Sequence, residues 1–335
     1  MLIDGGIGFD TADAALTAAQ AEEDGFDGLW CAETGHDPFL PLLLAAEHTE
    51  RIDLGTAIAV AFARTPMTMA IMANDLQAYS KGRFILGLGS QIKPHITKRY
   101  SMPWSHPVPR MREFISAMQE IWKSWNEGTK LAFRGDFYTH TLMNPLFDPG
   151  RNPYGPPKVF VAAVGGLMTE VAGEVADGLL VHGFTTERYM REVTIPALER
   201  GLAKAGRKLD SYEISYPAMV VTGDTEEQMK TAKLAVKGQI AFYGSTPAYR
   251  QVLELHGWGE LQTELNTLSK KGKWEQMSGL IDDEVVGTFA VVSPPEEVAK
   301  ILRARFGDIV TRITFYAPYQ MERRRLRELL GGFRS

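Results

Sequence analysis

Short apolar runs alternate with longer stretches of helical periodicity along almost the whole chain. Glycine, proline or small polar residues flank each run, which is typical of a buried strand followed by a turn. The run RFILGLGS at 83–90 is nearly all apolar, as expected when both faces of a parallel sheet are covered. Eight runs fit this description: 2–9, 27–33, 52–60, 83–90, 158–164, 178–182, 212–222 and 312–317.

The stretches between these runs carry the start signals of helices. Thr65–Pro66 and Asp37–Pro38 each place a capping side chain before a proline that suits the first helical position. Asp224 or Thr225 is predicted to open another helix, with Gln228 placed for a capping box. Apolar residues between 111 and 125 recur at the helical spacing of three and four. Eight strands, each followed by a helix, predict a closed (β/α)8 TIM barrel.

Three segments do not fit this simple alternation. Residues 91–108 are predicted as a long loop after strand four, and 130–140 as a small hairpin. Residues 238–286 hold a further series of short helical patterns after strand seven. We therefore predict one domain over 1–335, with insertions after strands four and seven. A doubly wound open sheet is the alternative, and the count of eight strands favours the barrel.

Composition and charge limit the classes of function. The chain has 335 residues, 44% of them hydrophobic and 23% charged, as in ordinary globular proteins. Its net charge of −5 argues against nucleic acid as the main partner, since that needs a basic face. Cys31 is the only cysteine, so no internal disulfide can form. The first Lys or Arg is Arg51, and the longest apolar stretch, 38–46, is too short for a bilayer. We therefore expect a cytoplasmic protein that is not embedded in a membrane.

In such barrels the reactive groups lie at the carboxyl ends of the strands and in the loops that follow. Glu33, Thr34 and His36 follow the second strand. Glu33 suits an acid, a base or a hydrogen-bond partner of a heterocycle, and equally a salt-bridged carboxylate at the rim. His36 suits a proton donor near neutral pH, and equally a loop residue that caps the next helix. Their spacing is not that of a metal site, so no metal is expected.

Glycines and basic residues also lie at strand ends. Gly165–Gly166 stands between strand five and its helix, where bare amides at the positive end of the helix dipole bind phosphate; a tight turn is the alternative. Gly87 and Gly89 resemble part of a dinucleotide fingerprint, but Ile92 replaces the third glycine. Close backbone approach at the barrel mouth explains them equally well. The basic residues after strand four are either solvated or attract an anionic cofactor tail or substrate: Lys93, His95, Lys98 and Arg99.

Three longer segments carry a family resemblance: IDLGTAIAV at 52–60, SKGRFILGLGSQIKPH at 80–95 and KVFVAAVGGLMTEVAGEVADGLLVHGF at 158–184. Together they resemble the luciferase-like monooxygenase superfamily, and within it the branch that uses the deazaflavin coenzyme F420. The resemblance runs from the first strand to SPPEEVAKIL at 293–302. It implies the same barrel, with an insertion after strand seven.

The resemblance also implies where the cofactor binds. Family members usually carry a non-prolyl cis peptide in strand three behind the cofactor ring, which here corresponds to Ala57–Ile58. Ser90 and Gln91 fall where relatives contact the ring or the side chain of the cofactor. The family's phosphate loop corresponds to 162–166, so the remaining cofactor-binding residues are expected to be Ala163, Val164, Gly165 and Gly166.

The chain departs from its relatives in two places. Some deazaflavin-dependent dehydrogenases end strand two with Asp-His, where this chain has Glu33–Thr34, with His36 two residues later. They also place an acidic residue after strand four, where this chain has Gln91 and Ile92. The proton donor therefore stays open among Glu33, Thr34 and His36. Sugar-phosphate dehydrogenation is not expected.

The sequence thus predicts an oxidoreductase that transfers a hydride between coenzyme F420 and a small organic substrate. Two alternatives stay open: an FMN-dependent monooxygenase that uses reduced flavin and O2, and a flavin-binding protein without turnover. The insertion at 238–286 is expected to shape the pocket or act as a lid. The resemblance implies a homodimer, and the apolar helices after strands two and three are compatible with one.

Overall fold

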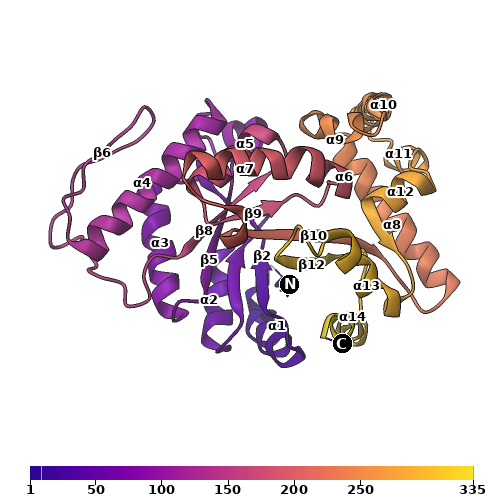
Figure 1. Ribbon diagram of the computed structural model, residues 1–335, viewed down its shortest axis with the longest axis horizontal. Helices are drawn as coiled ribbons and strands as arrows, with labels where there is room; N and C mark the ends of the chain where they lie inside the picture. Colours follow the sequence, from indigo (N-terminus) through magenta and orange to yellow (C-terminus); the bar gives the residue numbers. More distant parts are fainter. Residues whose placement is uncertain (9, 335) are drawn as a thin grey trace.

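In the computed structural model, which describes residues 1–8 and 10–334, the chain forms a closed parallel barrel surrounded by helices (Figure 1). The predicted (β/α)8 fold is confirmed. β12 pairs with both β1 and β10, and β10 also pairs with β9, so the sheet closes on itself. In chain order the barrel strands are β1 (Leu2–Gly6), β2 (Gly28–Cys31), β3 (Asp53–Thr56), β5 (Phe84–Gly89), β8 (Lys158–Ala163), β9 (Gly178–Val181), β10 (Glu213–Val221) and β12 (Arg312–Tyr316). The first strand was predicted over 2–9, and position 9 lies outside the described residues.

A helical segment follows each barrel strand and covers the outside of the barrel. Thr65 accepts a hydrogen bond from the amide of Thr68 and caps α3, as predicted. Thr225 likewise caps α8 by accepting a hydrogen bond from the amide of Gln228. The side chain of Gln228 accepts from the amide of Asp224 instead of that of Thr225, so only one of the two bonds of the predicted capping box is formed. These helices are α1 (Thr11–Asp24), α2 (Phe39–Glu47), α3 (Pro66–Tyr79), α4 (Pro107–Glu127), α5 (Gly166–Val175), α6 (Glu187–Tyr189) with α7 (Ile195–Lys204), α8 (Glu226–Gly244) and α14 (Arg323–Arg334).

Three predicted elements differ in detail from the structure. The strand at 52–60 stops at the end of β3 and resumes as β4 (Ala59–Val60), and the peptide bond between Ala57 and Ile58 is cis. The loop at 91–108 contains a π-helical turn, His95–Arg99, because Pro94 already has helical dihedral angles and starts the turn. The helix at 186–205 contains another π-helical turn, Met190–Thr194, just before a proline that has no amide to donate.

The predicted insertion after β10 is present but begins later. α8 continues to Gly244, and four short helices and a 3-10 turn, Pro247–Tyr249, follow it (orange in Figure 1). They pack against α8 in an apolar cluster that also receives Phe184. A short strand, β11 (Ala290–Val292), pairs with the outer part of β10 and was not predicted, because three residues carry too little periodicity. The helices are α9 (Arg250–Glu254), α10 (Gly259–Lys270), α11 (Trp274–Gly279) and α12 (Asp283–Phe289), and after β11 α13 (Pro295–Phe306) leads to β12.

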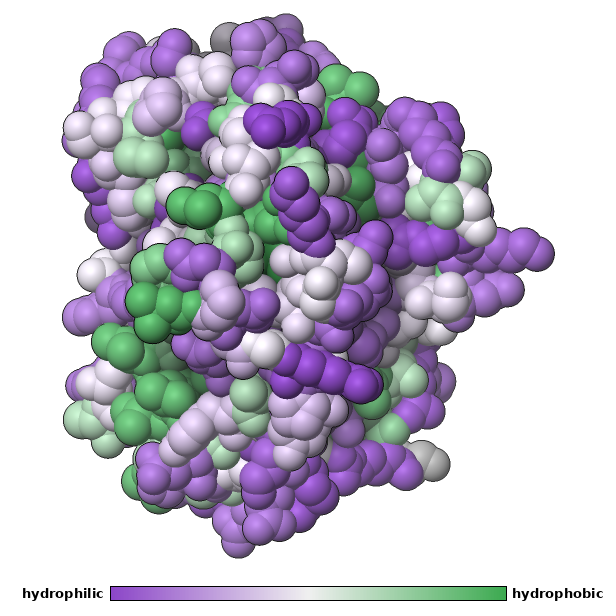
Figure 2. Space-filling view, turned by 90° about the vertical axis from the view of Figure 1, so that its left-hand side faces the viewer, coloured by the Kyte–Doolittle hydropathy of each residue, from purple (hydrophilic) through white to green (hydrophobic). Residues whose placement is uncertain are grey.

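The predicted hairpin projects from the opposite side of the molecule as β6 (Phe133–Arg134) and β7 (Thr139–His140). Figure 2 shows this side, which is largely hydrophilic with apolar side chains gathered toward one edge. The neighbouring helices α2 and α3 also expose apolar side chains: Leu40, Leu43, Ile71 and Met72. Homodimerisation stays a prediction.

No helix among residues 1–8 and 10–334 is long and apolar enough to cross a membrane.

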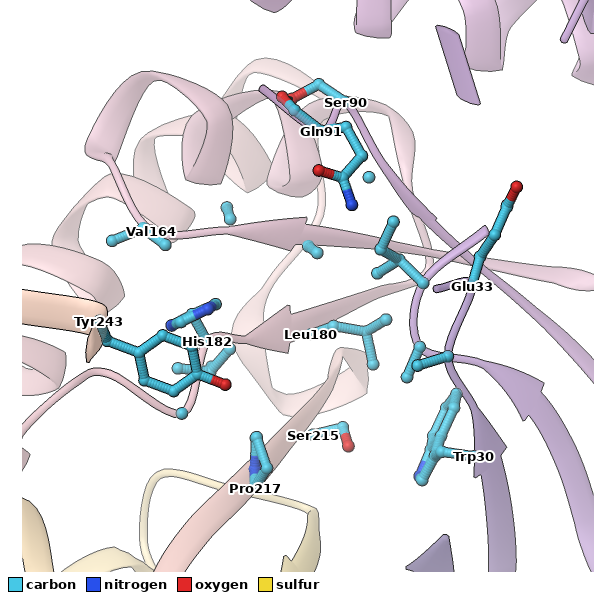
Figure 3. A pocket seen from close by; sticks show the side chains of 18 of the residues that line it. Trp30, Glu33, Ser90, Gln91, Val164, Leu180, His182, Ser215, Pro217 and Tyr243 are labelled. Atoms are coloured by element: carbon cyan, nitrogen blue, oxygen red, sulfur yellow. The ribbon is translucent and has the colours of Figure 1, made fainter. Parts of the chain in front are cut away.

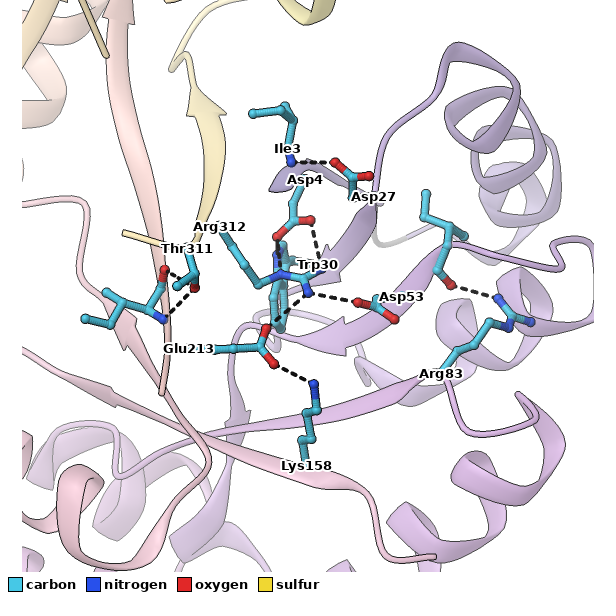
Figure 4. A network of polar contacts seen from close by, with 12 residues as sticks. Ile3, Asp4, Asp27, Trp30, Asp53, Arg83, Lys158, Glu213, Thr311 and Arg312 are labelled. Carbon is cyan, nitrogen blue, oxygen red and sulfur yellow. Dashed lines mark hydrogen bonds and ion pairs between the residues drawn. The ribbon is translucent and has the colours of Figure 1, made fainter. Parts of the chain in front are cut away.

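A buried charged network closes the amino-terminal end of the barrel (Figure 4). Arg312, whose side chain is 1% exposed, donates to both carboxylate oxygens of Asp4 at 2.8 and 2.9 Å. Its Nη1 also donates to Asp53 at 2.8 Å and to Glu213 at 3.3 Å, so one guanidinium joins β12 to β1, β3 and β10. The indole of Trp30 donates to Asp4 at 2.8 Å and lies beneath the guanidinium. These charges lie at the end of the barrel where the strands begin, away from the expected reactive end.

Candidate active site

A cavity of about 550 Å³ opens at the carboxyl ends of the barrel strands (Figure 3). Ligand sites commonly have volumes in this range. Trp30, Leu180, Ser215 and Pro217 line it from within the barrel. His182 and Tyr243 lie on the opposite side of the cavity from Glu33 and Trp30, as Figure 3 shows.

The structure brings most of the predicted site residues to this cavity. Gly165 and Gly166 follow Val164 at the start of α5, just beyond the lining residues. His36 is exposed and lines a separate hollow beside α1, so the structure does not bring it to the barrel mouth. The predicted residues that line the cavity are Glu33, Thr34, Ala57, Ile58, Ser90, Gln91, Ala163 and Val164.

Glu33 is buried at the end of β2, and both oxygens of its carboxylate are engaged. Oε2 accepts from Arg64 at 2.6 Å and from the amide of Val60 at 2.7 Å, and Oε1 accepts from the Tyr100 hydroxyl at 3.0 Å. Arg64 also pairs with Asp37 at 3.0 Å. The interpretation of Glu33 as a salt-bridged rim carboxylate therefore describes its contacts in this structure.

This network fixes the backbone on which the cofactor ring is expected. The amide of Glu33 donates to the carbonyl of Ile58 at 3.1 Å, and Arg64 donates to the carbonyl of Val60 at 3.3 Å. Residues 57–60 are thus held on the side of β2 by one carboxylate and one guanidinium. With this many partners, the Glu33 side chain is well placed to hold the 57–60 segment in position.

Gly87 and Gly89 serve close packing beside this segment. A Cβ at Gly87 would lie 1.8 Å from the carbonyl oxygen of Thr56, and one at Gly89 would lie 2.9 Å from the side chain of Ile58. Only glycine lets β5 approach β3 and Ile58 so closely. Of the two interpretations left open for these glycines, the structure favours close approach at the barrel mouth.

Gly165 is the N-cap residue of α5 and has no side chain to satisfy the first amides of the helix. Its φ of −85° and ψ of 149° are open to any residue, and a Cβ there would meet only the end of Gln251, at 3.2 Å. Space and unpaired helical amides at the positive end of a dipole are what an anionic group requires. The local geometry therefore fits a phosphate.

An aromatic cluster on the far wall was missed by the sequence reasoning. His182 at the end of β9 lies with its ring centre 4.7 Å from that of Tyr243 and 4.6 Å from that of Tyr249. Tyr243 forms a hydrogen bond of 3.0 Å with Tyr316 through their hydroxyls. The sequence offered only His182 at a strand end, because aromatic residues on helices are most simply interpreted as core.

The basic loop after strand four folds back over the second strand. Arg99 donates to the carbonyl of Thr34 and stacks on Tyr100, 5.0 Å from the ring centre. Within residues 1–8 and 10–334, no group of three or more His, Cys, Asp or Glu side chains is arranged to hold a metal ion. Arg99 thus holds the loop after β5 against the end of β2.

Comparison with known proteins places the chain in a family. The sequence pattern of the luciferase-like monooxygenase family matches residues 4–312. The chain belongs to this family. An uncharacterized protein of Mycobacterium tuberculosis is 58% identical over 311 residues, which cover 93% of this chain and 92% of the relative. A 5,10-methylenetetrahydromethanopterin reductase of Archaeoglobus fulgidus is 27% identical over 93% of this chain and 91% of its own.

Solved structures agree on the fold. The coenzyme F420-dependent tetrahydromethanopterin reductase of Methanopyrus kandleri superposes with a TM-score of 0.80 at 23% identity, covering 99% of this chain and 97% of its own. The luciferase-like (β/α)8 barrel is therefore the shared architecture. F420-dependent oxidoreductases are among the relatives of this chain. Membership of this family therefore supports the prediction that the chain is an enzyme.

Proposed function

We propose that the protein is an oxidoreductase that uses coenzyme F420. One observation carries the proposal: the cavity at the barrel mouth is lined by Ala57–Ile58 and by Val164, next to the open N-terminus of α5 at Gly165. A planar ring with a phosphorylated side chain needs an apolar wall joined to an anion site in this way. The coenzyme F420-dependent reductase of Methanopyrus, which superposes on 99% of this chain, supports F420 as the cofactor.

The residues present fit such a group. Ala57 and Ile58 would back the ring, Ser90 and Gln91 would offer hydrogen bonds from above, and the start of α5 would hold the phosphate. The amide of Gln91 points into the cavity in Figure 3. The deazaflavin, when bound, supplies the hydride chemistry. The chain's own part is to orient the two reactants and to exclude water from between them.

Binding of purified protein to oxidised F420 and to FMN, followed by quenching of cofactor fluorescence, tests this proposal. We expect F420 to bind at least about tenfold more tightly than FMN, a difference of about 1.4 kcal/mol. Tight binding of FMN without binding of F420 would contradict the proposal and favour the monooxygenase alternative. Binding of F420 without turnover across carbonyl, alkene and alcohol substrates would favour a non-catalytic binding protein.

We further propose that Glu33 is a positioning residue. Glutamine in its place keeps the size but removes the charge that Arg64 faces at 2.6 Å, so the 57–60 segment should loosen. Glu33→Gln is expected to weaken cofactor binding by about 5- to 20-fold, as for loss of a charged hydrogen bond. The pH profile of turnover should keep its shape.

Asp37→Asn is the matched control, because Asp37 pairs with the same arginine but its side chain is 36% exposed. It should change cofactor affinity by less than about threefold. Loss of an ionisation from the pH profile of Glu33→Gln, with cofactor affinity unchanged, would instead make Glu33 an acid or base. Thr34 and His36 stay predictions for proton handling.

The insertion and the oligomeric state complete the proposal. Tyr249 lies in the insertion and lines the cavity, which supports a role of 238–286 in shaping the pocket.

A homodimer formed through the exposed apolar residues of α2 and α3 is our proposal for the assembly. Sedimentation of the purified chain measures it directly.

A further inference from the structure

The wall of the cavity opposite the 57–60 segment has an unusual chemistry. It consists of one imidazole and three phenols: His182, Tyr243, Tyr249 and Tyr316. Tyr243 lies on α8, and Tyr249 lies on the 3-10 turn of the insertion. The other two, His182 and Tyr316, lie at the carboxyl ends of the barrel strands β9 and β12. If the cofactor ring lies against Ala57–Ile58, this wall faces the second reactant.

The hydrogen bonds of the cluster fix the direction of its protons. The amide of Phe184 donates to Nδ1 of His182 at 3.0 Å, so a neutral imidazole must carry its proton on Nε2. Nε2 lies 3.3 Å from the hydroxyl of Tyr249, which therefore accepts this proton. The hydroxyl proton of Tyr249 is not used in this bond and is free to be donated.

The second pair of hydroxyls leaves another donor. Tyr243 and Tyr316 share one hydrogen bond of 3.0 Å, in which one hydroxyl donates and the other accepts. The accepting hydroxyl keeps its own proton for a further partner. Two hydroxyl protons, that of Tyr249 and one of the Tyr243–Tyr316 pair, are therefore not used in the hydrogen bonds within the cluster.

The wall is also uncharged at neutral pH. Burial lowers the pKa of His182 to about 4 and raises the pKa of Tyr249 to about 12. Burial, followed by the neighbouring hydroxyl of Tyr316, raises the pKa of Tyr243 as well. Among the described residues that line the cavity there is no Lys, Arg or Asp, and the one carboxylate, Glu33, is paired with Arg64 at 2.6 Å. A charged group on the substrate would find no counter-ion on this wall.

We infer that the hydroxyl of Tyr249, which His182 orients, and the Tyr243–Tyr316 pair bind the oxygen of an uncharged substrate, a carbonyl or hydroxyl group on an otherwise apolar body. The inference deepens the proposed function and rests on it for the position of the ring. Tyr249 is the specificity residue, because its hydroxyl is oriented by His182 and its proton is free. Apolar neighbours such as Leu180 and Pro217 would contact the rest of the molecule.

The test compares two ligands of similar shape, 4-methylcyclohexanone and 4-oxocyclohexanecarboxylate. Binding of each is measured by ligand-observed NMR, first to cofactor-free protein and then to protein loaded with F420. We expect the neutral ketone to bind at least about tenfold more tightly than the carboxylate in both forms. Tyr249→Phe should weaken ketone binding by about 5- to 10-fold, as for loss of one hydrogen bond, and change F420 affinity by less than about twofold.

Tyr79→Phe is the control, because Tyr79 is 49% exposed on α3, outside the cavity. Equal or tighter binding of the carboxylate, no binding of the ketone, or an unchanged ketone affinity in Tyr249→Phe would each overturn the inference. Weaker F420 binding in Tyr249→Phe, with ketone binding intact, would assign the hydroxyl to the cofactor instead. If F420 does not bind at all, the proposed function fails, while the cofactor-free measurements still decide what the cluster recognises.

Discussion

Replacing Gly165 by aspartate is expected to weaken F420 binding roughly 100-fold, about 2.7 kcal/mol. Gly165 is the N-cap residue of α5, and a Cβ there would meet only the flexible end of Gln251, at 3.2 Å. Aspartate fits the backbone and is a favourable N-cap residue, so the fold should tolerate it. Its carboxylate would occupy the helix amides and repel the cofactor phosphate. Fluorescence titration of the variant with F420 measures the loss.

Gly165→Asn is the matched variant, because asparagine has the same shape and caps helices equally well but carries no charge. It should keep F420 affinity within about fivefold of the unmodified protein, since only steric displacement and competition for the amides remain. Equal losses in the aspartate and asparagine variants would show that space rather than charge matters at this position. Equal affinities in all three proteins would move the phosphate away from α5.

Replacing Arg312 by methionine is expected to lower the free energy of unfolding by about 3–5 kcal/mol. The side chain of Arg312 is 1% exposed and that of Asp4 is fully buried, so the variant leaves a carboxylate inside the barrel without its counter-ion. Asp53 and Glu213 lose a donor at the same time. Urea denaturation followed by tryptophan fluorescence measures the change.

Two further variants define the cause of this loss. Adding Asp4→Asn to Arg312→Met should recover about 1–2 kcal/mol, because a buried amide costs less than a buried unpaired charge. Arg324→Met removes an exposed arginine that also pairs with two carboxylates, Asp224 and Glu328, and should lower the free energy of unfolding far less, because solvent screens an exposed pair. A loss in Arg312→Met no larger than in Arg324→Met would contradict a closing role for the network.

The elements that the sequence predicted well are those whose signal is local. A buried parallel strand is apolar throughout, as at 83–90, and a helix start such as Thr65–Pro66 is specified by neighbouring residues. Elements whose limits depend on distant partners were less well predicted. β11 exists because β10 extends past the barrel to pair with it, and α8 runs on to Gly244 because the insertion packs along it.

The candidate site divides in the same way. Strand-end positions follow from the barrel topology, so the sequence alone predicts Ala57, Ile58, Ser90 and Gln91 at one mouth, where the structure has them. The role of Glu33 could not, because its partners Arg64 and Tyr100 are 31 and 67 positions away in the chain. His36 illustrates the reverse case, since a residue close to Glu33 in sequence lies in a different hollow.

The sequence by itself therefore determined the barrel, its order and the end at which the site is expected, because hydrophobic periodicity and turn residues act over a few positions. Tertiary structure alone decided which side chains face one another across the mouth. His182, Tyr243, Tyr249 and Tyr316 come from four separate segments and meet only when β9, α8, the turn after it and β12 are assembled. Hydrogen-bond direction and burial, which set the charge of that wall, are properties of the assembled contacts and of no single segment.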